Sequence, residues 1–170
     1  MWIAGTVLAV LAVPAMAVGA VLAVGALLPA GHTARCSARL PADPGTVWAV
    51  VTDIDGYPSW RPGLRTVERL PDVDGRPRWR ERDRHGVITY EVTEAAPPSR
   101  LVTRIADDGL PFGGTWTYEV SPDPGGSTVT VTEDGVVRNP VFRFVSRFET
   151  GHTATIDAYL KALAARLGRA

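Results

Sequence analysis

The chain has 170 residues, enough for one domain of ordinary size and an additional segment. Its 18 lysine and arginine residues are balanced by 18 aspartate and glutamate residues, so no net positive field attracts nucleic acid, and we exclude that partner. The single cysteine, Cys36, excludes an internal disulfide.

A long apolar run opens the chain. No charged side chain occurs from Trp2 to Leu28, and the run exceeds the ~20 residues that a helix needs to span a bilayer. A cleaved signal peptide would be shorter, and a buried helix would need a larger protein around it. We predict a transmembrane anchor over residues 1–30, with membrane contact through residues 2–28, and a separate domain over residues 31–170. Because Arg35 and Arg39 follow the run, the positive-inside rule predicts a single-pass membrane protein whose C-terminal domain is cytoplasmic.

A first strand and two short helices follow. Polar and apolar residues alternate from His32 to Leu40, which is typical of a strand. Asp43 suits a helix N-cap and Pro44 suits a first helical position, so a short helix is expected over Thr46 to Asp53. A second short turn is expected from Tyr57 to Trp60, closed by a Trp-Arg-Pro-Gly loop.

The middle of the chain consists of successive strands separated by turn residues. Consecutive hairpins indicate an antiparallel sheet with one polar and one apolar face. The expected strands are Leu64–Leu70, Arg76–Arg84, Val87–Ala95, Arg100–Ala106, Thr115–Val120 and Ser127–Val137.

The last stretch, Asn139 to Leu167, reads as one long amphipathic helix. Asn139 can cap it and Pro140 suits its first turn. This helix is the one predicted element large enough to cover the apolar face of the sheet. The pattern therefore predicts an α+β helix-grip fold, in which an antiparallel sheet curls around a long C-terminal helix and one transmembrane helix precedes both.

The segment Pro44 to Arg65, the motif Pro111 to Trp116 and the order of elements resemble the START-like, or SRPBCC, superfamily, which includes polyketide cyclase/dehydrase and lipid-transfer-like proteins. The resemblance extends from about Thr33 to Leu167. It implies a deep apolar cavity between sheet and helix that holds a small hydrophobic ligand. Because this superfamily hosts transport, sensing, cyclisation and hydrolysis, the fold alone does not define an activity.

Nine residues are candidate cavity-lining ligand contacts, because they are aromatic or lie on the apolar stripe of the last helix. Plain core packing is the alternative for all of them. His152 interrupts the stripe beside Gly151, so it is either a core histidine or a polar group in the cavity. The candidates are Trp60, Trp79, Tyr90, Trp116, Tyr118, Phe148, His152, Ile156 and Tyr159.

Four charged residues have an ambiguous orientation. Glu81, Asp83 and Glu133 fall on inward strand faces if the register holds, and either face of the strand that carries Arg104 is fairly apolar. They would line the cavity or lie in water at strand ends. The sequence shows no phosphate-binding loop, no metal-ligand spacing and no nucleophile motif, so we predict no catalytic residue, no metal and no cofactor.

Three functions are consistent with these patterns. The first is membrane-anchored binding or transfer of a hydrophobic small molecule, such as a lipid, a quinone or a polyketide-like compound. The second is a cyclase or dehydratase that uses His152 with an inward carboxylate. The third is an interaction module for a membrane complex, in which the arginine row of the strand from Arg76 meets the partner.

Overall fold

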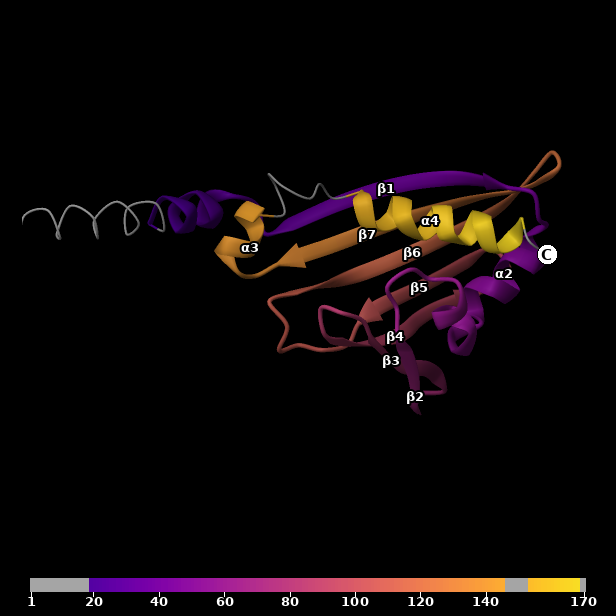
Figure 1. Ribbon diagram of the computed structural model, residues 1–170, viewed down its shortest axis with the longest axis horizontal. Coiled ribbons are helices and arrows are strands. Elements are labelled where there is room, and N and C mark those ends of the chain that lie inside the picture. The colour runs from indigo at the N-terminus through magenta and orange to yellow at the C-terminus, as the bar shows by residue number, and fades with distance from the viewer. Residues whose placement is uncertain (1–18, 146–152, 169–170) are drawn as a thin grey trace, which may run out of the picture.

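The computed structural model describes residues 19–145 and 153–168, and a sheet of seven antiparallel strands is its main element (Figure 1). The strands are β1 (Gly31–Leu40), β2 (Thr66–Val73), β3 (Arg76–Arg82), β4 (Val87–Ala96), β5 (Arg100–Ile105), β6 (Phe112–Asp123) and β7 (Gly126–Val137). They lie in the order β1-β7-β6-β5-β4-β3-β2, so the first and the last strands of the chain pair with each other. This is the predicted α+β helix-grip architecture.

The alternation of side chains places apolar residues on one face of the sheet. Val129 and Val131 of β7 are fully buried on that face, whereas Arg35 of β1, which faces Thr132, is exposed. Strand β6 begins earlier than predicted, because Gly113 and Gly114 continue the ladder with β7 instead of forming a loop. Gly114 has a φ of +144°, and a Cβ there would collide with the backbone of β7, so this close pairing requires glycine.

Two short helices follow β1, as predicted: the α-helix α2 (Pro44–Thr52) and the 3₁₀-helix η1 (Ile54–Ser59). Asp43 caps α2 by accepting hydrogen bonds from the backbone N–H groups of Gly45 at 2.9 Å and Thr46 at 3.1 Å. The hydroxyl of Tyr57 donates to the carbonyl oxygen of Val51 at 2.6 Å, which ties η1 to α2. The loop after η1 joins the sheet where the backbone N–H of Arg65 donates to the carbonyl oxygen of Arg82 at 2.9 Å.

The predicted single helix from Asn139 to Leu167 is wrong. Two helices occur in this stretch, α3 (Pro140–Val145) and α4 (Ala154–Leu167), and residues 146–152 lie outside the described residues. Thr153 occupies the N-cap position of α4, so a new helix begins at Ala154. Threonine and the nearby Gly151 have low helix propensity, which explains why the apolar stripe alone overestimated the helix length.

Helix α4 nevertheless covers the apolar face of the sheet (Figure 1). Ile156 and Leu163 are fully buried, and Tyr159, Leu160 and Leu167 are nearly so. Together with the inward residues of the strands and of α2, they form one contiguous core.

The prediction of a single-pass membrane protein with a cytoplasmic C-terminal domain is contradicted. Within the described residues no helix is both long enough and apolar enough to cross a bilayer. Residues 1–18, which supply most of the apolar run, lie outside the described residues. The remainder of the run is helical over residues 19–27.

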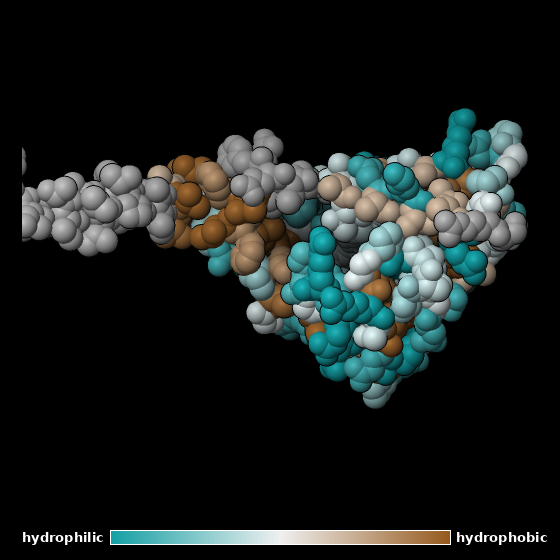
Figure 2. Space-filling model, viewed as in Figure 1, coloured by the Kyte–Doolittle hydropathy of each residue, from teal (hydrophilic) through white to brown (hydrophobic). Residues whose placement is uncertain are grey.

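The helical stretch 19–27 lies beside α3, away from the rest of the domain (Figure 1). The guanidinium of Arg143 in α3 donates to the carbonyl oxygen of Leu28 at 3.4 Å. Figure 2 shows apolar surface gathered at this end of the molecule. Its exposed apolar side chains are Leu22, Val24, Leu27, Val141, Phe142 and Val145.

The outer face of the sheet is charged but locally balanced. Arg80 of β3 pairs with Glu68 of β2 at 3.1 Å, and Arg76 lies 3.5 Å from Asp74. Arg104 of β5 pairs with Glu91 of β4 at 2.7 Å. Within the described residues, Arg76 and Arg80 of the β3 arginine row have carboxylate partners, whereas Arg78 and Arg82 form no ion pair.

Replacing Leu163 with alanine should destabilise the fold by about 2–5 kcal/mol, because it leaves a cavity where α4 packs on the sheet. Leu163 is fully buried, whereas Lys161 on the same helix is exposed. Urea unfolding followed by tryptophan fluorescence measures the loss in the free energy of unfolding. The matched variant Lys161→Ala should change it by less than about 0.5 kcal/mol. Equal effects of the two variants would contradict the packing of α4 on the sheet.

Candidate functional site

Aromatic side chains from four elements meet on the inward face of the sheet. Trp79 of β3 stacks on Tyr90 of β4, with ring centroids 5.6 Å apart. Tyr159 of α4 lies 5.5 Å from Tyr118 and 5.7 Å from Trp116, both of β6. Strand alternation accounts for the inward orientation of these rings, and their separations suit favourable aromatic pairing.

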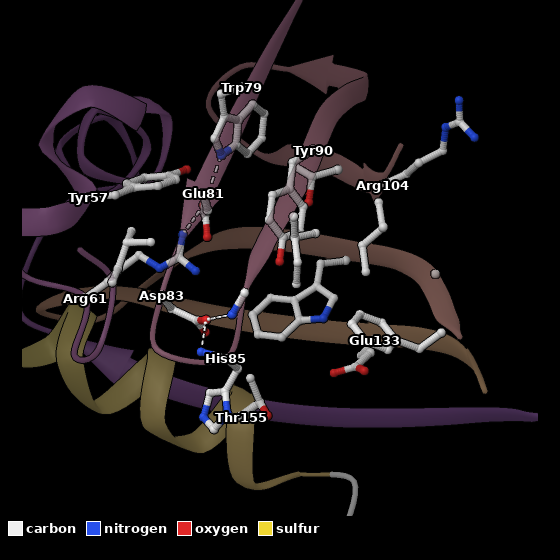
Figure 3. A pocket seen from close by; sticks show the side chains of 18 of the residues that line it. Tyr57, Arg61, Trp79, Glu81, Asp83, His85, Tyr90, Arg104, Glu133 and Thr155 are labelled. Atoms are coloured by element: carbon white, nitrogen blue, oxygen red, sulfur yellow. Dashed lines mark hydrogen bonds and ion pairs between the residues drawn. The ribbon is translucent and has the colours of Figure 1, made fainter. Parts of the chain in front are cut away.

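A cavity of about 630 Å³ lies beside this aromatic cluster (Figure 3). Its wall combines aromatic rings with a small number of polar groups, a composition typical of small-molecule sites. The lining residues come mainly from the loop after η1, the β3–β4 hairpin and strands β5 to β7, with Thr155 contributed by α4.

The nine predicted candidates divide into three groups. Trp79, Tyr90, Trp116 and Tyr118 line the cavity. Trp60, Ile156 and Tyr159 do not line it and pack in or against the core. Phe148 and His152 lie outside the described residues.

A buried ion pair stands at one side of the cavity. The guanidinium of Arg61 donates to Oε1 of Glu81 at 2.6 Å, and the indole N–H of Trp79 donates to the same oxygen at 2.9 Å. The Glu81 side chain is 8% exposed and that of Arg61 is 24% exposed. The Arg61 guanidinium also lies over the ring of Tyr57, 4.8 Å from its centroid, which adds a cation–π contact.

Arg61 stays charged in this environment. Burial acts to lower the pKa of its guanidinium, but the carboxylate of Glu81 raises it, and the balance leaves the pKa of Arg61 above its ordinary value. The pair is therefore a fixed dipole beside the cavity. Sequence reasoning missed Arg61, although the Trp-Arg-Pro-Gly loop that holds it was the unusual feature of that region.

Three of the four tyrosines are buried, Tyr90 is half-buried, and all four stay protonated at neutral pH. Burial raises the pKa of Tyr118 to about 12, and burial also raises the pKa values of Tyr57, Tyr90 and Tyr159 above the ordinary range. The Tyr57 hydroxyl is committed to the carbonyl oxygen of Val51, whereas those of Tyr90 and Tyr118 belong to residues that line the cavity. They can offer hydroxyl hydrogens to a ligand.

The four residues of ambiguous orientation all line the cavity, but they differ in their partners. Glu81 is paired with Arg61. Oδ1 of Asp83 accepts from the backbone N–H groups of His85 at 2.6 Å and Gly86, so this carboxylate shapes the hairpin turn.

The other two lie elsewhere on the wall. The guanidinium of Arg104 pairs with Glu91 of the adjacent strand. Glu133 of β7 lies 3.4 Å from the imidazole of His32. His85 is exposed in the β3–β4 turn and also borders the cavity.

No group of three histidine, cysteine, aspartate or glutamate side chains within residues 19–145 and 153–168 is placed to hold a metal ion. The polar groups on the cavity wall therefore suit hydrogen bonding and charge stabilisation. With the aromatic rings, they provide a site for an organic molecule.

Comparison with known proteins gives a family and a fold. A family model described as polyketide cyclase / dehydrase and lipid transport matches residues 32–168. Comparison with curated protein sequences finds no match.

Solved structures share the architecture at low sequence identity. The Zhui aromatase/cyclase from Streptomyces sp. R1128 is 16% identical with a TM-score of 0.68, over 82% of this chain and 94% of that one. A START superfamily protein from Mycobacterium smegmatis is 21% identical with a TM-score of 0.65, over 81% of this chain and 98% of that one.

The di-domain ARO/CYC StfQ from the steffimycin biosynthetic pathway is also similar, with 10% identity and a TM-score of 0.68. The alignment covers 82% of this chain and 52% of StfQ, so the chain spans about half the length of that protein. At these identities the likeness concerns the fold alone.

Proposed function

The chain belongs to the family of polyketide cyclase/dehydrase and lipid-transport proteins, and on that premise we propose that it binds a hydrophobic small molecule in its cavity. The observation that carries the proposal is the cavity of about 630 Å³ walled by Trp79, Tyr90, Trp116 and Tyr118. Such a space accommodates a compound of several fused rings or a polyketide-like chain.

The wall favours a planar, unsaturated ligand. Flat rings stack on aromatic side chains in offset or edge-to-face geometry, and such pairs add about 0.5–1.5 kcal/mol beyond burial. The protonated tyrosine hydroxyls and the Arg61 guanidinium are donors, so they suit carbonyl oxygens on the ligand. A saturated acyl chain would leave these donors unused.

The experiment is a binding measurement with a cavity-filling variant. Ile88 of β4 lines the cavity, and its neighbour Val87 does not. Successive strand residues point to opposite faces, so Ile88→Trp should fill the cavity whereas Val87→Trp should not. We expect Ile88→Trp to weaken binding of the fluorescent probe 2-methoxyanthracene at least about tenfold, equivalent to ~1.4 kcal/mol.

Val87→Trp is the matched control, because it adds the same ring at the adjacent position and should leave affinity within about threefold. Thermal unfolding of both variants verifies that each remains folded. Two results would contradict the proposal: a wild-type chain that neither binds the probe nor copurifies with an apolar compound in native mass spectrometry, or equal losses of affinity in the two variants.

A cyclase- or dehydratase-type reaction is the second candidate. It is supported by the family description and by the charged pair Arg61–Glu81 beside an aromatic cavity. His152, the residue on which the sequence prediction of catalysis depended, lies outside the described residues. The mass of a polyketide-like compound incubated with the protein separates the two functions. Binding alone returns it unchanged, whereas a dehydrating cyclisation returns it with the mass of water lost.

A further inference from the structure

A carboxylate and an imidazole form a second polar pair at the cavity, apart from Arg61 and Glu81. Glu133 lies on the same face of β7 as the fully buried Val129 and Val131, and it lines the cavity. Oε1 of Glu133 lies 3.4 Å from Nε2 of His32 on the neighbouring strand β1. His32 is not part of the lining, so the imidazole stands behind the carboxylate relative to the cavity (Figure 3 shows Glu133 apart from Arg61 and Glu81).

The pairing of β1 with β7 leaves space for the imidazole of His32 over Gly135. His32 faces Gly135 across the β1–β7 ladder, and a Cβ at Gly135 would collide with the imidazole ring. A residue other than glycine would therefore displace the ring. The side chains of His32 and Glu133 are 17% and 23% exposed, so both are held largely out of water.

Glu133 has an oxygen available for a ligand. Two other carboxylates line the cavity, and one oxygen of each already accepts two hydrogen bonds: Oε1 of Glu81 from Arg61 and Trp79, and Oδ1 of Asp83 from the hairpin turn. Within the described residues, the Glu133 side chain makes no hydrogen bond other than the one with His32, which uses Oε1. The second oxygen, Oε2, can therefore accept a hydrogen bond from a donor that a ligand brings into the cavity.

We propose that the Glu133–His32 pair recognises a hydroxyl group, phenolic or enolic, on the ligand of this cavity. The inference rests on the proposed binding function and adds that the bound ligand carries a hydroxyl group. Carbonyl oxygens face the donors Arg61, Tyr90 and Tyr118, and a hydroxyl donates to Glu133.

The test compares two fluorescent probes, 2-hydroxyanthracene and 2-methoxyanthracene, on the full chain at neutral pH; a methyl group replaces the hydroxyl hydrogen in the second, which removes the donor. A hydrogen bond to the Glu133 side chain should make the wild-type protein prefer the hydroxyl probe by at least about tenfold. Glu133→Leu removes the acceptor and should bring this preference to within about twofold. Glu133→Gln should lie between them.

Two further variants separate recognition from stability. His32→Phe keeps a ring in the space over Gly135 but removes Nε2, and it should reduce the preference for the hydroxyl probe. Glu119→Leu is the control, because Glu119 pairs with Arg35 and Arg100 outside the cavity, and it should leave the preference unchanged.

The outcomes distinguish the two claims. If both probes bind the wild-type protein equally, or if Glu133→Leu keeps the preference, the assignment of Glu133 is overturned while the binding function stands. If neither probe binds, the binding function and this inference are both overturned.

Discussion

Raising the pH from about 8 to about 12 should unfold the protein in one cooperative transition, with its tyrosines ionising only as it unfolds. All four tyrosines have pKa values above the ordinary value near 10, and that of Tyr118 is about 12. In the unfolded chain they would lose their protons near pH 10. Above that pH the unfolded state therefore binds fewer protons than the folded state, and the free energy of unfolding falls as pH rises.

The expected loss in the free energy of unfolding is large because all four tyrosines contribute to it. Between its unfolded and folded pKa values, each tyrosine lowers the free energy of unfolding by about 1.4 kcal/mol per pH unit. Over about two pH units, the loss caused by four tyrosines is comparable to the total stability of a typical domain. Below about pH 10 both states are protonated, so tyrosines give no pH dependence there. The window of lost stability thus runs upward from pH 10 toward the pKa of Tyr118 near 12.

Tyrosinate absorbance and far-ultraviolet circular dichroism should change together across the titration. Tyr90→Phe removes one ionisable group from the cavity wall and should reduce the slope of stability against pH by about a quarter. A rise of tyrosinate absorbance near pH 10 with unchanged circular dichroism would contradict the burial of these hydroxyls.

Replacing Arg61 with leucine should cost about 3 kcal/mol of stability, because the carboxylate of Glu81 would remain buried without its partner. The indole of Trp79 would still donate to that carboxylate, but a neutral donor compensates a buried charge only in part. The double variant Arg61→Leu/Glu81→Gln should recover more than half of the loss, since a neutral amide keeps an acceptor for Trp79 and removes the unpaired charge.

Arg69 provides the matched control for this measurement. Its ion pair with Asp55, at 3.0 Å, is exposed to solvent, and Arg69→Leu should change the free energy of unfolding by less than about 1 kcal/mol. Urea unfolding of the three variants gives the comparison. If Arg61→Leu costs no more than Arg69→Leu, the pair at the cavity does not have the energetic role assigned to it.

The membrane and helix predictions failed for different reasons. The apolar run predicted a span, but no helix within residues 19–145 and 153–168 is long enough and apolar enough to cross a membrane. The stripe of apolar residues predicted one helix from Asn139, but a stripe reports which face is buried and not whether the helix is continuous. The N-cap at Thr153 begins α4 anew.

The sequence by itself determined the order of the elements and the direction of the strand side chains. Alternation with a period of two is a local property, so it placed Trp79 and Glu81 on one face and Tyr90 and Tyr118 on the matching faces of their strands. Caps and turn residues are equally local, and Asp43 with Pro44 correctly indicated where α2 begins.

Only the tertiary structure decided which of these residues meet. Arg61 and Glu81 are 20 positions apart, and His32 and Glu133 are 101 positions apart, so their pairing depends on how the loop after η1 and the strand β1 are placed against the sheet. The tertiary structure also decided which aromatic candidates line the cavity and which pack in the core. An inward side chain does one or the other according to how α4 and the loops pack above it. Such contacts depend on the geometry of the whole chain, which no local pattern of residues encodes.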